Sequence, residues 1–184
     1  MGNWNKYLNN QKYSECQLVT ALNAYYYLTG EVYCKQDSDE YEKLVDECCA
    51  RHGSAIGIEK IHKKLGLEII GYSNHISTNF ENDWLTLRQI KNRKKGIYPK
   101  IHKPIKSSRG KITLPIEITI WHKKTGYHSA IIIDHCLKTE CFKIANFSQV
   151  TSNKGWMFVE DLYLYINDMN KGWCFRLFGI KDKK

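Results

Sequence analysis

The chain has 184 residues, 42% of them hydrophobic, which is typical of one globular domain with a sizeable core. No apolar run is long enough for a membrane span, and the first ten residues lack the apolar centre of a secretory signal, so we expect a cytoplasmic protein without membrane contact. The formal net charge is +9, and the seven cysteines lack metal-site spacing, so we expect reduced thiols.

The first predicted element is a helix over residues 17–28, where the run QLVTALNAYYYL carries no charge. Gly30 stands where a helix C-terminus favours glycine, and Ser14 is the expected N-cap. Cys16 then falls in the first turn, where unpaired N–H groups and the helix dipole favour thiolate over thiol. The sequence therefore indicates a nucleophile at the tip of a buried helix.

Three further helices are expected, over residues 41–51, 57–65 and 83–91. A short strand is expected between the last two, over residues 67–72. The basic segment, residues 88–111, then holds ten lysines or arginines and no acidic residue. One interpretation of the basic segment is a solvated loop. The alternative is a surface that contacts an acidic protein or a nucleic acid.

The second half is rich in Ile, Thr and aromatic residues, which predicts antiparallel strands over residues 112–121, 127–134, 140–147 and 173–180. Residues 123–126 are the expected hairpin turn, and 156–166 the expected short helix or turn. Because helices come first and strands second, the predicted class is α+β. We treat 1–184 as a single domain, with a helical half to about residue 91 and a sheet half from about residue 112.

A cysteine nucleophile needs a base, and the base needs a group that orients it. Among the seven histidines, His128 is selected because it opens an apolar strand. If Leu137 lies at the centre of the following turn, His128 faces Asn146, with their Cβ atoms about 4.5–5.5 Å apart. We therefore expect the Asn146 side chain to hold the His128 imidazole by a hydrogen bond.

This pattern resembles that of papain-like cysteine peptidases, in the order Gln11, Cys16, His128 and Asn146. The runs GYHSAIIIDHC, FKIANF and GWMFVEDLYLYI are most similar to the C39-like branch, which includes bacteriocin leader-processing peptidases. The resemblance implies a papain-like fold, with the nucleophile helix packed on a C-terminal antiparallel sheet. It also implies Cys16 as nucleophile, His128 as general base and acid, and Asn146 as orienter. Gln11 would donate its amide to the oxyanion hole, beside the Cys16 backbone N–H.

Three positions depart from the pattern of that branch. Gln17 stands where glycine is frequent, Asn146 replaces the common Asp, and Phe147 replaces a frequent Pro. An amide oxygen can also accept the imidazole N–H, so Asn146 keeps the orienting role. The substrate and the subfamily stay open.

The expected function is hydrolysis of peptide or isopeptide bonds in a peptide or protein substrate, with no metal or organic cofactor. The alternative is a catalytically silent papain-like module that binds nucleic acid or an acidic protein through the basic segment. Taken singly, Cys16, His128 and Asn146 also have structural interpretations, as a small buried residue, a strand-end histidine and a turn residue.

Metal binding is a further alternative, at Cys48 and Cys49 with His52, or at Cys136 with Cys141. Neither group contains a C-x₂-C pair, and no second half of a site is evident in the sequence. We therefore treat the cysteines other than Cys16 as structural.

Overall fold

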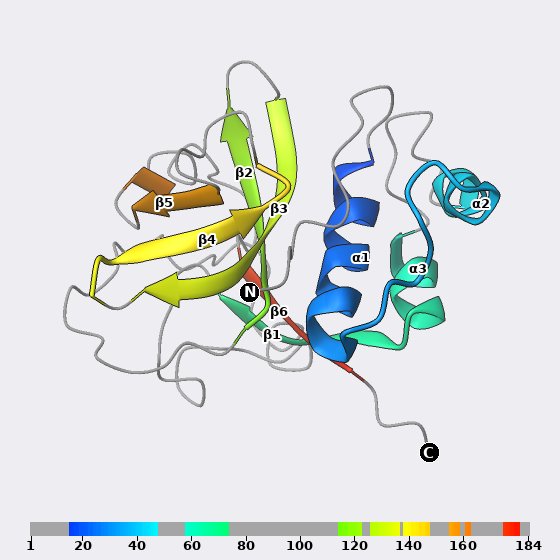
Figure 1. Ribbon diagram of the computed structural model, residues 1–184, viewed down its shortest axis with the longest axis horizontal. Coiled ribbons are helices and arrows are strands. Elements are labelled where there is room, and N and C mark those ends of the chain that lie inside the picture. Colours follow the sequence, from blue (N-terminus) through cyan, green and yellow to red (C-terminus); the bar gives the residue numbers. More distant parts are fainter. Residues whose placement is uncertain are drawn as a thin grey trace, which may run out of the picture.

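The computed structural model describes residues 15–47, 58–73, 114–122, 126–136, 138–147, 155–158, 161–162 and 175–180. Within these ranges three helices precede six strands, and the strands form one sheet (Figure 1). The helices are α1 (Cys16–Thr29), α2 (Asp39–Glu47) and α3 (Ile58–Lys64). The strands are β1 (Leu67–Ser73), β2 (Ile116–His122), β3 (Gly126–Cys136), β4 (Cys141–Ala145), β5 (Trp156–Phe158) and β6 (Phe175–Ile180). The predicted α+β class is confirmed.

Helix α1 begins at Cys16, and its C-terminus has the predicted glycine cap. Gly30 has a φ of 76°, and its N–H donates to the Tyr26 carbonyl at 2.9 Å. This left-handed conformation favours glycine. The N-cap is Glu15 and not Ser14, so that prediction is wrong by one residue. The buried Glu15 carboxylate makes no cap hydrogen bond and instead accepts one from the Tyr41 hydroxyl of α2 at 2.6 Å.

A side-chain cap sets the start of helix α2, and a glycine follows the end of helix α3. The Ser38 hydroxyl accepts a hydrogen bond from the Tyr41 N–H at 3.2 Å, which caps α2 two residues earlier than expected. Helix α3 ends just before Gly66, whose φ of 67° turns the chain into β1. Both helices lie on the same side of the molecule as α1 (Figure 1).

The sheet has the strand order β1-β6-β2-β3-β4-β5, and every neighbouring pair is antiparallel. Strands β2, β3 and β4 are the predicted consecutive antiparallel strands, and β5 extends them to a four-stranded meander, whereas β6 inserts between β1 and β2. The C-terminal strand therefore joins the β1 of the helical half to the meander. In this way one sheet includes strands from both halves of the chain.

Strand β5 corrects one prediction, because residues 156–158 were expected to form a helix or a turn. Trp156 and Met157 instead pair with Lys143 and Phe142 of β4. A short apolar run has no periodicity that separates a helix from a strand. Pairing with the backbone groups of β4 makes residues 156–158 a strand, and the local sequence does not specify this pairing.

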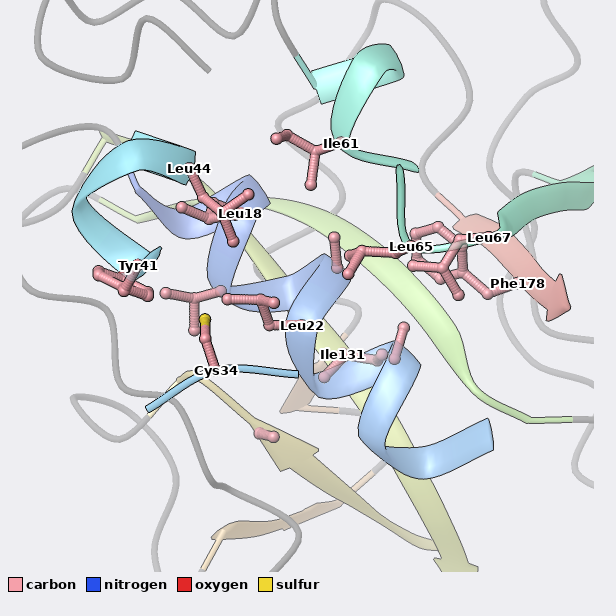
Figure 2. Packing of buried hydrophobic residues seen from close by; sticks show 14 of the residues in the cluster. Leu18, Leu22, Cys34, Tyr41, Leu44, Ile61, Leu65, Leu67, Ile131 and Phe178 are labelled. Carbon is pink, nitrogen blue, oxygen red and sulfur yellow. The ribbon is translucent and has the colours of Figure 1, made fainter. Parts of the chain in front are cut away.

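Hydrophobic side chains form one cluster on each face of the sheet. Successive β3 residues point to opposite faces, so Ile131 and Ile133 pack against the helices, while Ala130 and Ile132 pack in the second cluster. Figure 2 shows the helical cluster gathered around α1, with labelled side chains that include Leu18, Leu44, Ile61 and Ile131. The first turn of α1 is thereby held over one face of β3.

Two expectations fall outside this description. The basic segment and the helical segment expected over residues 83–91 lie outside the described residues, and the single domain 1–184 stays a prediction. Among the helices that the structure describes, none combines the length and the apolar character needed to cross a membrane.

Candidate active site

Cys16 is the first residue of α1, and α1 packs along β3 (Figure 1). One turn further along the helix, the buried Thr20 hydroxyl donates to the Ser129 carbonyl at 3.1 Å. This bond holds the first turns of α1 against the early part of β3. Ser129 directly follows His128, so the helix tip and the candidate base are brought to the same end of the sheet.

Asn146 joins the other two candidate residues. It directly follows β4 and has a φ of 63°, a left-handed conformation that asparagine adopts more readily than most residues. Its backbone carbonyl contacts His128 Nε2. Its side-chain Nδ2 donates to the Ser129 carbonyl at 3.0 Å and to the Cys16 carbonyl at 3.4 Å. Asn146 therefore contacts both of the other candidate residues, the His128 ring through its backbone carbonyl and the Cys16 carbonyl through its side chain.

The predicted hairpin register is wrong, although it places Asn146 near His128. In the structure Ala145 pairs with Ile131, and a bulge shifts the register between Ile132 and Asp134. Continuing the pairing of Ala145 places Asn146 opposite Ala130, two residues from the predicted position. Because side chains alternate along a strand, a shift of two residues keeps the same face. In this arrangement the backbone carbonyl of Asn146 contacts the imidazole.

The contact with Asn146 assigns the proton on the His128 ring. A carbonyl oxygen only accepts, so Nε2 carries the hydrogen and Nδ1 holds the lone pair of the neutral ring. Burial lowers the pKa of His128, and the Asn146 carbonyl partly opposes this shift. The ring is also stacked on Phe147, with centroids 5.8 Å apart. A neutral, fixed imidazole is the form that a general base requires.

The Cys16 thiol does not follow the sequence-based expectation of a stabilised thiolate. Burial raises the pKa of Cys16, hydrogen bonds from the backbone of Ser129 and Gln17 oppose the increase, and the charge of Glu117 adds to it. The net pKa lies above the ordinary value. The loss of water around this half-buried sulfur therefore has a larger effect than the backbone hydrogen bonds it receives.

Sequence analysis missed a buried polar group beneath the site. The Glu117 side chain of β2 is 3% exposed; it accepts from the Ser129 hydroxyl at 2.7 Å and from Arg176 Nη1 at 3.0 Å. Arg176 Nη2 also donates to the Thr119 hydroxyl at 3.3 Å. The alternation in IEITI would place Glu117 on a solvated face. Only the pairing of β2 with β3 and β6 places its partners beside it.

Several sequence-based candidates lie outside the described residues: Gln11, the basic segment, Cys48, Cys49 and His52. Cys136 and Cys141 are described and lie directly opposite each other across β3 and β4. In the part of the chain that the structure describes, no three His, Cys, Asp or Glu side chains gather as metal ligands would.

Comparison with protein-family models, with curated proteins and with solved structures found no match to this chain. The fold and the site define an α+β protein in which an asparagine after β4 links a helix-tip cysteine to a buried histidine, where α1 packs on β3. The functional argument accordingly depends on these residues and their contacts.

Proposed function

We propose that this protein is a papain-like cysteine peptidase of the C39-like type, which hydrolyses peptide or isopeptide bonds through an acyl-enzyme on Cys16. The observation that carries the proposal is the bridging position of Asn146. Its carbonyl accepts a hydrogen bond from His128 Nε2, and its amide donates to the carbonyls of Ser129 and Cys16. The neutral His128 ring carries its lone pair on Nδ1, and in this proposal that atom exchanges a proton with the Cys16 thiol.

The raised pKa of Cys16 makes the thiol the resting form, so His128 acts as a base during the attack. Nδ1 takes the proton from the sulfur as the sulfur bonds to the substrate carbonyl carbon. The oxyanion that forms is stabilised by the backbone N–H of Cys16 and the amide of Gln11. His128 then protonates the leaving amine, and finally removes a proton from the water that hydrolyses the thioester.

Asn146 is a positioning residue in this mechanism. Its left-handed backbone directs a carbonyl at His128, which fixes the tautomer. Its side chain ties the start of α1 to β3, and so holds the nucleophile and the base in a constant relation. The family resemblance implies an amide-to-imidazole hydrogen bond, and the carbonyl contact is a further way in which Asn146 holds the His128 ring.

The rival function is a catalytically silent module of the same fold, which binds an acidic protein or nucleic acid through the basic segment. One observation favours it, because the raised pKa of Cys16 is that of an ordinary buried thiol. The two functions differ in one measurable property. Only a catalytic Cys16 depends on His128 for its reactivity.

Alkylation kinetics separate the two functions without knowledge of the substrate. Cys16 would be mapped after limited reaction with iodoacetamide at about pH 7.5, in the wild type and in His128→Ala. We expect at least a ~10-fold slower reaction at Cys16 in His128→Ala, because a general base contributes about 10²-fold or more.

The matched control is His62→Ala. His62 is also a histidine whose pKa burial lowers, but its ring packs against Phe178. Its removal should leave the Cys16 rate unchanged. Equal Cys16 rates in the wild type and His128→Ala would overturn the catalytic proposal and favour the silent module.

Gln11 tests the oxyanion step once a library of fluorogenic peptides has yielded a cleaved sequence. Gln11→Ala should lower kcat about 10²-fold with little change in KM, because the donor acts on the developing anion. Gln11→Glu should be at least as damaging, since a carboxylate repels that anion. Wild-type turnover in Gln11→Ala would remove Gln11 from the site.

A further inference from the structure

The tip of the β3–β4 hairpin carries two cysteines that the proposed function does not use. Cys136 ends β3, Cys141 begins β4, and the two are direct partners across the strands. Opposed residues of antiparallel strands have Cα atoms about 4.5–5.5 Å apart. That spacing lies within the range of about 4.4–6.8 Å that a disulfide spans.

Both sulfur atoms also lie at the same residue of the turn. Cys141 Sγ contacts the Thr139 carbonyl at 3.4 Å. The Cys136 thiol is hydrogen-bonded by the Thr139 hydroxyl and by the Thr139 backbone, and these bonds lower its pKa. Two sulfurs that share one neighbour, on directly opposed residues, are placed to approach each other.

The adjacent residue pair fixes this register. His135 pairs with Phe142, and their rings are in contact with centroids 4.8 Å apart. Side chains alternate along each strand, so this ring contact holds one face of the hairpin while the two cysteines share the other. A slip of one residue would break the ring contact and separate the thiols.

We infer that Cys136 and Cys141 form a reversible intramolecular disulfide by exchange with a small-molecule disulfide such as oxidised glutathione. Cys136 reacts first, because Cys141 is buried and Cys136 is more accessible. The Cys136 thiolate attacks one sulfur of the small disulfide, which forms a mixed disulfide and releases one small thiol. The Cys141 thiolate then attacks Cys136 Sγ and releases the second small thiol. The protein loses two hydrogens, and the small disulfide gains them.

The inference is independent of the proposed peptidase and is tested by peptide mapping. Trypsin cuts after Lys138, so peptides 125–138 and 139–143 separate when the thiols are reduced and stay joined when they are linked. The folded protein would be incubated with oxidised glutathione, acid-quenched, alkylated and digested. We expect the joined pair to replace most of peptide 125–138, and dithiothreitol to reverse the change.

Single variants separate the two steps. Cys141→Ser should retain one glutathionyl group on Cys136, because the resolving thiol is absent. Cys136→Ser should leave Cys141 largely unmodified. Cys34 is the matched control thiol, since burial and the charge of Glu40 raise its pKa to about 11 and it should stay reduced throughout.

The inference is overturned if peptides 125–138 and 139–143 remain separate in the folded protein after this treatment. It is equally overturned if Cys136 is joined to another cysteine in preference to Cys141. Circular dichroism of each variant verifies that the folded protein was tested.

Discussion

Two cysteines near opposite ends of strand β3 have pKa values that are shifted in opposite directions. Near its start lies Cys16 of α1, a half-buried thiol whose pKa burial raises. At its end lies Cys136, whose pKa hydrogen bonds from Thr139 lower. The thiol at a helix N-terminus is thus the weaker acid of the two. Loss of water around Cys16 and the Thr139 hydrogen bonds to Cys136 account for the opposite directions of the two pKa shifts.

This comparison separates two kinds of reactivity. Cys136 has a lowered pKa and so a larger thiolate fraction than an ordinary cysteine, which lets it react with small disulfides without a partner base. Cys16 needs a base at the moment of attack, and His128 with its Nδ1 lone pair is the candidate. The experiments below test whether this division holds, beginning with the largest expected effect.

Replacing the two thiols should affect turnover very differently. Cys16→Ala should lower turnover of a cleaved peptide by roughly 10⁴-fold or more, because the acyl-enzyme cannot form. Cys136→Ser should leave turnover unchanged, since that residue lies at the far end of β3. Steady-state kinetics on both variants checks this pair. Full activity in Cys16→Ala would end the assignment of the nucleophile.

Glu117 should contribute most of the stability of the polar group beneath Cys16. Glu117→Ala removes the acceptor for both the Ser129 hydroxyl and Arg176, and should lower the free energy of unfolding by about 3 kcal/mol. Urea denaturation measures this value. Glu117→Gln should in addition lower the pKa of Cys16, because the charge of Glu117 raises it. The pH dependence of Cys16 alkylation should then shift to lower pH.

The matched control for Glu117 is an exposed ion pair of similar length. Lys64 Nζ and Glu47 Oε1 are 3.1 Å apart, with side chains 39% and 45% exposed. Glu47→Gln should change the free energy of unfolding by less than about 0.5 kcal/mol, because water screens the pair. If Glu117→Ala and Glu47→Gln lowered the free energy of unfolding equally, burial would not explain how much an ion pair contributes to stability.

Asn146 variants test whether its backbone or its side chain positions His128. Asn146→Gly keeps the left-handed φ and the carbonyl, and should lose only about 1 kcal/mol of stability with its amide contacts. Asn146→Asp places a carboxylate against the carbonyls of Ser129 and Cys16, and should lose about 1–3 kcal/mol.

Turnover should follow the same order, with Asn146→Gly more active than Asn146→Asp. If the side chain of residue 146 orients the imidazole instead, the aspartate would be the better substitute and the order would reverse. The pH profile of kcat/KM provides a second measurement, because a retained carbonyl keeps the His128 titration in place in Asn146→Gly.

The smallest expected effect is on the pH dependence of stability. The pKa of His128 is about 6.5 in the unfolded chain, and burial lowers it in the folded protein. Between these two values the unfolded state binds more protons, so the free energy of unfolding decreases as pH falls through about 6.5 and levels off below the folded pKa. Urea denaturation from about pH 7.5 to 5 should therefore show a shallower decrease in His128→Gln. An unchanged slope would contradict a neutral, buried His128.

The elements of this protein were largely predictable because their signals are local. An uncharged apolar run with a terminal glycine predicts α1 and its C-cap at Gly30, and segments rich in Ile, Thr and aromatic residues predict β2, β3, β4 and β6. The order of helices and strands then gives the α+β class. The short strand β5 was missed, since its three residues acquire their conformation only by pairing with β4.

The candidate site was predictable as a set of residues but not as a geometry. Sequence order and spacing selected Cys16, His128 and Asn146. The bulge in β3 and the left-handed Asn146 belong to the pairing of β3 with β4, and the burial of Glu117 depends on Arg176 of β6, which lies far along the chain. Those features place the Asn146 carbonyl against His128, while burial raises the Cys16 pKa that the helix tip alone was expected to lower. Sequence therefore determined which groups are available, whereas the tertiary structure set their solvation and hydrogen bonds, because both depend on neighbours that local sequence does not specify.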